Sequence, residues 1–546
     1  MLSRCVVGAL LLLCISGPAA IMARPQPKLV VVISIDQFRY DYLTRFEKHF
    51  VARGFNLFLK EGANFVCARH GHALNKTAAG HAVIMSGAYA NHHGIISNDW
   101  YDVEGQSEVY CVGDLTVHTI GAEGEGRSPK NLMATTVGDH LRESNAGQSK
   151  VIAVSNKDRA AVLMGGKLAN AAYWMIDSAF VTSSYYMADL PEWVKQYNRT
   201  NPVLAYFDKS WERLLPEAEY AVQGVDDFHA EETANGMDRA FPHRIRGMRK
   251  RLTSSFFRAF DCSPFASEVL VDFARQGIVH EQLGQRGVTD LLCLSFSAND
   301  RIGHAFGPNS HEVMDVTLRT DRLLEQFFAF LDEKIGLQNC TIILTSDHGV
   351  APLPELLRAH NPSLEAGRVD ESEFARTAEQ ALEKEFGKLK KARRWISYTD
   401  DGMLYLNPSA LEEKAIAAAT AEHTVDLALE ALPAVYASFT HSQLAANRSS
   451  DELGTKMLRS FFAERSGNVS VILKPWFIDA PDGATHGQPW NYDAHVPLLW
   501  FGAGIKPDTY YEAVSIVDIA PTLAAMLGIS RPSGSHGRIL SEILRD

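Results

Sequence analysis

Six side chains of the types that hold divalent metals stand in short motifs with suitable spacing. Asp300 and His304 are four residues apart in Asp-Arg-Ile-Gly-His, so one helical turn would place both on the same face. Asp347 and His348 are adjacent in Thr-Ser-Asp-His-Gly, where a turning backbone can direct both into one cleft. Three carboxylates and three imidazoles are enough for two mixed sites, which suits Zn²⁺, with manganese or iron as alternatives. The full set is Asp36, Asp300, His304, Asp347, His348 and His486.

Each of these side chains alone also fits a helix cap, a surface charge or a core histidine, and only their joint occurrence favours a metal centre. Thr77 is a candidate nucleophile, because a polar loop passes there into small and apolar residues in Asn-Lys-Thr-Ala-Ala-Gly-His. A helix beginning at that point would direct backbone N–H groups at an anion, and a coordinated metal would lower the pKa of the hydroxyl. The ordinary alternative is a threonine that caps the helix.

Three further polar side chains could hold a phosphoryl group. Asn98 offers an amide donor in Gly-Ile-Ile-Ser-Asn-Asp-Trp-Tyr-Asp. Lys157 and Arg159 are two residues apart after an apolar run, so in extended backbone they would share a side. An ammonium and a planar guanidinium together suit the non-bridging oxygens of a phosphate dianion. An isolated Lys-x-Arg is most often surface charge, and the position at the end of an apolar run is what favours binding.

The elements that would position these residues are short apolar runs that end in polar residues. The runs cover 28–35, 151–154, 291–296, 341–344 and 496–501. Continuous Val, Ile and Leu without alternation predict strands buried on both faces of a largely parallel sheet, and helices are predicted at 310–336 and 516–527. Ligands of open α/β sheets bind beyond the carboxyl ends of the strands, so the polar residues are expected to converge there.

We expect one α/β domain over residues 24–546, in which helices sandwich the sheet. Residues from about 180 to 287 and from about 353 to 483 are more charged and less strand-like, which predicts cap insertions. The 546 residues are 46% hydrophobic and 22% charged, which excludes disordered and fibrous classes. The net charge of −12 argues against a broad surface for nucleic acid or anionic membrane.

The N-terminus predicts a secretory signal peptide over residues 1–23. Arg4 precedes an apolar run of ten residues at 6–15, too short to span a bilayer, and small residues follow. A lipoprotein built on Cys14 is the weaker alternative, because Leu13 is large where that processing needs a small residue. No later stretch reaches spanning length, so the mature chain is expected to be soluble and periplasmic or secreted. Among the five remaining cysteines, Cys67 and Cys111 are the best guess for a disulfide.

At these motifs the sequence resembles the alkaline phosphatase superfamily, and within it the bacterial PafA-like, phosphate-irrepressible alkaline phosphatases with a threonine nucleophile. The similarity extends from Asp36 to about Leu527. Its motifs are Asp36, Thr-Ala-Ala-Gly-His at Thr77, Ser-Asn-Asp-Trp-Tyr-Asp at Asn98, Lys157 with Arg159, Asp-Arg-Ile-Gly-His at Asp300, Ser-Asp-His-Gly at Asp347, and Thr-His-Gly at His486. Sulfatases of the superfamily are disfavoured, because Cys67-Ala-Arg lacks the proline of their motif.

The resemblance implies two zinc ions and a division of their ligands. One zinc would be held by Asp300, His304 and His486. The second would be held by Asp36, Asp347 and His348 together with the Thr77 oxygen. It also implies a monomer, and it places Lys157 and Arg159 where other branches of the superfamily have a third metal or nothing.

The sequence therefore predicts an exported alkaline phosphatase that hydrolyses small phosphate monoesters through a phosphothreonine on Thr77. Asn98, Lys157 and Arg159 would hold the equatorial oxygens of the phosphoryl group. Two cationic donors favour a doubly charged monoester over a diester. The alternatives are a nucleotide pyrophosphatase/phosphodiesterase with the same metal frame, and an exported metal- or phosphate-binding protein without turnover.

Overall fold

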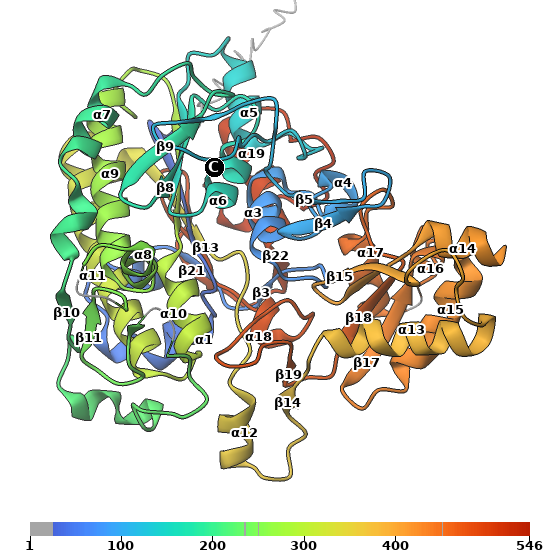
Figure 1. Cartoon of the computed structure of the whole chain (residues 1–546). Coiled ribbons are helices and arrows are strands. Elements are labelled where there is room, and N and C mark those ends of the chain that lie inside the picture. The colour runs from blue at the N-terminus through green and yellow to red at the C-terminus, as the bar shows by residue number, and fades with distance from the viewer. Residues whose placement is uncertain (1–25, 234–235, 249–250, 450, 546) are drawn as a thin grey trace, which may run out of the picture.

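The computed structural model describes residues 26–233, 236–248, 251–449 and 451–545, and the expected signal peptide lies outside them. A ten-stranded sheet crosses the described part of the chain (Figure 1). Its strands, in spatial order, are β21 (Asp508–Tyr510), β2 (Ala63–Phe65), β20 (Leu498–Gly502), β13 (Cys340–Thr345), β1 (Leu29–Ile35), β12 (Asp290–Phe296), β7 (Val151–Ser155), β8 (Ala171–Ile176), β9 (Ala179–Ser183) and β6 (Thr119–Ile120).

The five central strands, from β13 to β8, are parallel, which confirms the predicted fold class. Leu29 of β1 pairs with Asp290 of β12 on one side and with Cys340 of β13 on the other. The apolar run at 496–501 was expected to be a further parallel strand, but β20 is antiparallel to β13. Burial on both faces produces the same continuous apolar pattern in either direction, so the sequence alone did not distinguish them.

Helices cover both faces of the sheet because side chains of the buried strands alternate between two cores. Leu29, Val31 and Ile33 of β1 pack on one side with α9 (Phe265–Glu281) and α11 (His311–Ile335). Val30 and Val32 pack on the other side, with the helices α3 (Thr77–Ser86), α6 (Asp158–Gly165) and α19 (Ile519–Leu527). Figure 1 shows these two helical layers on opposite sides of the strands.

The predicted helices are present with small changes at their ends. Ser310 caps α11 by accepting a hydrogen bond from the Val313 N–H at 3.1 Å, and the helix ends before Gly336. The helix expected at 516–527 begins with a 3₁₀ turn, η6 (Ile516–Asp518), before α19.

A side lobe, defined here as residues 372–473, has a core of its own. Its antiparallel sheet contains β15 (Ile396–Asp400), β16 (Met403–Leu406), β18 (Val469–Leu473) and β17 (Val435–Thr440), with α13 (Ser372–Phe386) and α15 (Ala418–Glu430) packed on it. It projects to one side of the molecule in Figure 1. Residues 180–287 instead contribute α9 and its neighbours to the core of the main sheet. The division into a catalytic domain and two caps stays a prediction.

The remaining elements connect these layers. They are α1 (Asp41–Arg45), α2 (Phe55–Glu61), β3 (Ala68–Arg69), α4 (Ala90–His93), β4 (Asp99–Asp102), β5 (Ser107–Tyr110), α5 (Val137–Ser144), α7 (Glu192–Arg199), β10 (Lys209–Trp211), β11 (His243–Ile245), α8 (Ser254–Asp261), α10 (Ala298–Phe306), α12 (Pro354–His360), β14 (Gly367–Arg368), α14 (Pro408–Lys414), α16 (His441–Ala445), α17 (Glu452–Ser460), β19 (Phe477–Ile478), α18 (Asn491–Ala494) and β22 (Val514–Ser515), besides short 3₁₀ turns.

The expected disulfide between Cys67 and Cys111 is wrong. Both thiols are free, as are the other three cysteines of the described residues. Cys67 lies next to β3, which pairs with β22, whereas Cys111 is buried just after β5 in a separate hairpin. The two cysteines are successive along the chain, but the segments that contain them belong to different sheets. Among the described residues, no helix combines the length and the apolar character needed to cross a membrane.

Candidate active site

The carboxyl ends of four adjacent parallel strands bring most of the predicted residues to one edge of the sheet. Asp36 directly follows β1, and Asp347 and His348 follow its neighbour β13. On the other side of β1, β12 leads into α10, whose first turn contains Asp300. Lys157 follows the next strand, β7. The expected convergence at the strand ends is therefore present in the structure.

Two overlapping groups of side chains have the geometry of metal sites. The first contains Asp300, His304 and His486, and the second contains Asp36, Asp300 and His348. Within each group the ligand atoms lie within 4.8 Å of one another. His304 and Asp300, one turn apart on α10, approach to 3.1 Å between Nε2 and Oδ1.

Asp347 lies beside the second group. Its Oδ2 is 3.3 Å from the Nε2 of His348, and that same nitrogen is 3.5 Å from Oδ1 of Asp36. The structure thus gathers all six predicted side chains, and Asp300 belongs to both groups. The assignment of each carboxylate to one of two ions stays a prediction.

Backbone carbonyls fix the orientation of the three imidazoles. The Nδ1 atoms of His304, His348 and His486 lie 2.8, 2.9 and 2.7 Å from the carbonyl oxygens of Ala484, Gly349 and Asn75. A carbonyl can only accept, so each Nδ1 donates its N–H, and each Nε2 faces the carboxylates. This arrangement of the outer partners is what metal-binding histidines require. Burial also lowers the pKa of His348 to about 4, which keeps it neutral.

The carboxylates have acceptor atoms that the protein leaves unsatisfied. Oδ1 of Asp36 and Oδ2 of Asp347 are buried without a hydrogen-bond partner in the described part of the chain. Burial raises the pKa of Asp36 well above its ordinary value, and the neighbouring charges of Asp300 and Asp347 raise it further. For Asp300, burial acts in the same direction, but Lys157 and His304 outweigh it and hold the pKa well below the ordinary range. Unsatisfied oxygens and imidazole nitrogens facing one another fit a set of divalent cations, and the mixed oxygen and nitrogen ligands suit Zn²⁺.

Thr77 is the first residue of α3, and its side chain faces this cluster. Lys76 in extended conformation occupies the cap position, so Thr77 is not the capping residue. The Thr77 hydroxyl is 3.3 Å from Nε2 of His348 and is almost fully buried. Gly80 allows this approach, because a Cβ there would lie 2.2 Å from the carbonyl oxygen of Asp347.

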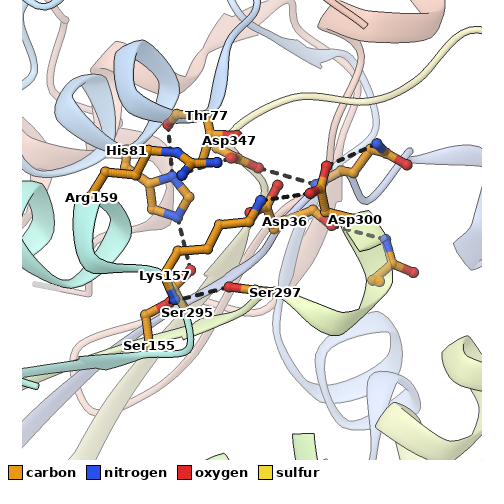
Figure 2. Close-up of polar contacts among 12 residues, drawn as sticks. Asp36, Thr77, His81, Ser155, Lys157, Arg159, Ser295, Ser297, Asp300 and Asp347 are labelled. Atoms are coloured by element: carbon orange, nitrogen blue, oxygen red, sulfur yellow. Dashed lines mark hydrogen bonds and ion pairs between the residues drawn. The ribbon is translucent and has the colours of Figure 1, made fainter. Parts of the chain in front are cut away.

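Asn98 lies beside the start of α3, and Lys157 reaches the cluster. The side-chain oxygen of Asn98 accepts a hydrogen bond of 3.0 Å from the N–H of Ala78, which leaves its amide group to act as a donor. The Nζ of Lys157 lies 2.6 Å from one oxygen of Asp36 and 2.6 Å from one oxygen of Asp300 (Figure 2). Lys157 therefore lies among the candidate metal ligands.

The expectation that Lys157 and Arg159 share extended backbone holds for Lys157, whose φ and ψ are −98° and 132°, but is wrong for Arg159. Lys157 caps α6, and Arg159 is inside that helix. Strand β7 ends at Ser155, so only two residues separate it from the helix. Both side chains extend from this turn in Figure 2, and the Arg159 guanidinium contacts the hydroxyl of Tyr110 at 3.4 Å.

Two residues around the site were missed from the sequence. His81 is one turn after Thr77 on α3, and its Nδ1 donates to the Thr77 carbonyl at 2.8 Å and lies 3.1 Å from Oδ2 of Asp347. The four-residue spacing from Thr77 is a signal that could have identified it. Gln37 donates from its side chain to Asp300 at 2.9 Å and from its backbone to Asp347 at 3.1 Å, with a positive φ of 64°. Nothing in the sequence marks that position.

Taken together, a buried hydroxyl, candidate ligands for two cations and nearby cationic and amide donors are the parts of a phosphoryl-transfer site. The hydroxyl can act as a nucleophile, cations can stabilise the attacking and leaving oxygens, and the donors can hold the remaining phosphoryl oxygens.

Comparison with known proteins places the chain among phosphate-ester hydrolases. The model of a family described as type I phosphodiesterase / nucleotide pyrophosphatase matches residues 30–482. Alkaline phosphatase PhoV of Synechococcus elongatus is 36% identical over 527 residues, 95% of this chain and 93% of that protein. A Myroides odoratus protein named calcium-transporting ATPase is 34% identical over 533 residues, 95% of each chain.

Alkaline phosphatase PafA of Elizabethkingia meningoseptica is 31% identical over 548 residues, 99% of this chain and 98% of that protein. The crystal structure of PafA superposes on this chain with a TM-score of 0.90, covering 96% of this chain and all of that one.

Proposed function

The chain belongs to the type I phosphodiesterase / nucleotide pyrophosphatase family, and we propose that it is an exported phosphomonoesterase with a two-zinc site and a phosphothreonine intermediate. Two predictions from the sequence are confirmed by the matches: the resemblance to PafA-like alkaline phosphatases, and an enzyme that hydrolyses phosphoric monoesters. The metal, the nucleophile and the export are the parts that this proposal adds.

One observation supports the proposal most: the Thr77 hydroxyl lies 3.3 Å from Nε2 of His348, which belongs to the second group of candidate ligands. A protein that only binds metal or phosphate needs no nucleophile, so a hydroxyl in this position favours an enzyme. A solved variant of PafA, with a TM-score of 0.89 to this chain, is substituted at a threonine, an asparagine, a lysine and an arginine. The same residue types follow in the same order here as Thr77, Asn98, Lys157 and Arg159.

In the proposed reaction, the Thr77 hydroxyl loses its proton and its oxygen bonds to phosphorus, while the bond from phosphorus to the leaving oxygen breaks and that oxygen takes up a proton to leave as the alcohol. A water then cleaves the phosphothreonine, which releases inorganic phosphate and restores the hydroxyl. Asn98, Lys157 and Arg159 donate to the non-bridging oxygens throughout. The six Asp and His side chains would hold the cations, which when bound supply charge stabilisation to the attacking and leaving oxygens.

Metal analysis with kinetics tests this proposal. We expect elemental analysis of the purified protein to find zinc at two per chain, and chelation to abolish hydrolysis of a phosphate monoester with recovery on adding zinc back. His304→Ala should lower the bound metal, whereas His360→Ala, at an exposed histidine that ends α12, should not. Full activity in metal-free protein would contradict the proposal.

A second candidate, diester hydrolysis, is favoured by the description of the family itself. We propose that monoesters are preferred, because Lys157 and Arg159 would match a doubly charged terminal phosphate. Removing either side chain should lower kcat/KM for a monoester by about 10²-fold and for a diester by much less. Equal losses on both substrates would favour the diesterase.

The proposed export rests on the N-terminal sequence alone. Mature protein from the native host should begin near residue 24 and be found in the periplasm or the medium. An intact N-terminus on the active cellular protein would contradict it. We further propose that the mature chain is a monomer acting on small soluble monoesters, which sedimentation of the active enzyme would check.

A further inference from the structure

A hairpin of the side lobe reaches the catalytic end of the main sheet. Strands β15 and β16 are joined by Asp401 and Gly402, and Asp400 pairs directly with Met403. Both turn residues have positive φ, 52° and 72°, which is the geometry of a two-residue hairpin turn that Asp-Gly favours. The sequence Asp-Asp-Gly-Met therefore fixes a tight tip that presents the Asp401 side chain.

The Asp401 carboxylate binds two residues that directly precede residues of the proposed machinery. Its Oδ1 lies 2.5 Å from Nζ of Lys76, the residue before Thr77. Its Oδ2 accepts a hydrogen bond from the hydroxyl of Ser97, the residue before Asn98. The side chains of Lys76 and Asp401 are only 10% and 20% exposed, so water screens this ion pair weakly.

Lys76 is held on its other side as well. A Cβ at Gly487 would lie 2.6 Å from Cε of Lys76, so the lysine chain packs against the backbone next to His486. The residue before it, Asn75, accepts the Nδ1–H of His486 on its carbonyl at 2.7 Å. The backbone at the start of α3 is thus fixed between the hairpin tip and the loop that contains His486.

The hairpin itself is docked, so its tip is not free to move. The ring of Tyr398 on β15 stacks on Tyr101 of β4 with centroids 5.1 Å apart and planes 10° apart. Tyr405 of β16 contacts the same ring edge-on at 5.7 Å. The backbone N–H of Gly402 donates to Glu371 at 2.5 Å.

We propose that Asp401 is a positioning residue: through Lys76 and Ser97 it fixes the Thr77 hydroxyl and the Asn98 amide relative to each other, and so makes catalysis depend on the side lobe. The proposal rests on the roles proposed above for Thr77 and Asn98. The hydrogen bond from Ala78 N–H to Asn98 already joins the two segments on the site side, and Asp401 joins them from behind.

The test compares Asp401→Asn, Lys76→Met and Ser97→Ala with Thr399→Val as the matched control. Thr399 is on the same strand, and its hydroxyl has no hydrogen-bond partner in the described residues. Asp401→Asn keeps an acceptor for Ser97 but removes the charge that holds Lys76. We expect it to lower kcat by about 10²-fold, the scale of a small misplacement of reacting groups, with a smaller change in KM.

Two further readouts separate positioning from mere stabilisation. The double variant Asp401→Asn with Lys76→Met should match the Lys76→Met single variant within about twofold, because both remove one interaction. Hydrogen exchange in metal-loaded protein should become faster in peptides covering 74–80 and 95–100 and stay unchanged in β12. Thr399→Val should keep wild-type kcat and exchange.

Normal kcat and normal exchange in Asp401→Asn would overturn the inference. It would also be overturned if the loss of kcat in the double variant equalled the two single losses combined. A failure of the proposed function can be told apart from a failure of this inference. If the proposed function is wrong, Thr77→Ala retains activity, independently of the hydrogen exchange measured in the 74–80 peptide.

Discussion

His81 shows how a residue outside the six candidate metal ligands supports the site. The Thr77 carbonyl can only accept, so Nδ1 of His81 donates to it, and Nε2 is hydrogen-bonded to the Ser295 hydroxyl at 2.9 Å. The imidazole therefore joins the start of α3 to Asp347 and to the end of β12. Outer partners of this kind orient ligand carboxylates and tune their affinity for metal.

We expect His81→Ala to lower metal affinity or kcat by about 10- to 100-fold, because Asp347 loses the imidazole whose Nδ1 lies 3.1 Å from its Oδ2. Titration of bound zinc and initial rates on a monoester measure the two effects. The exposed His360→Ala serves as the control. Wild-type zinc affinity and rate in His81→Ala would show that Asp347 needs no such partner.

At the scale of elements, the start of α3 approaches the loop after β13 more closely than any side chain would allow. A Cβ at Gly80 would lie 2.2 Å from the Asp347 carbonyl oxygen and 2.8 Å from its Cα, both backbone atoms that cannot rotate away. Close packing of this helix on the loop is what brings Thr77 to His348.

Gly80→Ala should therefore displace α3 from the loop and lower kcat/KM by about 10²-fold or more, although alanine is the better helix former. Gly277→Ala in α9 is the matched control, since a Cβ there would meet only Trp193 at an ordinary 3.7 Å. The control should keep its activity and gain about 0.5–1 kcal/mol in the free energy of unfolding. Rates and unfolding midpoints check both, and a fully active Gly80→Ala would refute the close-approach argument.

The sequence predicted elements well where the pattern has one physical cause. Apolar runs and caps located β1, β7, β12, β13 and α11, and the polar residues at their ends located the candidate site. The sequence did not predict the antiparallel direction of β20, because strands buried on both faces have the same apolar pattern in either direction. Arg159 was expected in extended backbone because a two-residue turn into α6 leaves no pattern in the sequence. Contacts such as those of Gln37 or Asp401 depend on how distant segments pack, which spacing along the chain does not encode.

At the scale of the whole molecule, the side lobe joins the main domain near α4 as well as at the hairpin tip. Arg465 of the lobe donates to the carbonyl oxygens of Gly94 and Asn131 at 2.5 and 2.8 Å. Beside it lies His93, fully buried, whose Nδ1 accepts from the N–H of Ile95 at 3.0 Å. Burial, and next the charge of Arg465, lower the pKa of His93 to about 3.

This histidine should make the junction sensitive to acid. A histidine in the unfolded chain titrates near pH 6.5, so below that value the unfolded state takes up a proton that folded His93 refuses down to about pH 3. Its contribution to stability is present above pH 6.5 and is lost as the pH falls through this window, by up to about 1.4 kcal/mol per pH unit.

The free energy of unfolding, measured with urea between pH 4 and 7, should fall less steeply with decreasing pH in His93→Asn than in the wild type. The exposed His118→Asn should leave the slope unchanged. An identical slope in all three proteins would contradict the account of His93.

The account depends most on Thr77 being the group that receives the phosphoryl moiety. Acid quenching of the zinc-loaded enzyme during turnover of a phosphate monoester, followed by peptide mass spectrometry, measures this directly. We expect phosphate on the peptide that contains Thr77, absent from Thr77→Ala, whose kcat should fall by about 10⁴-fold or more. An unmodified Thr77 peptide together with near-normal turnover by Thr77→Ala would contradict the central claim.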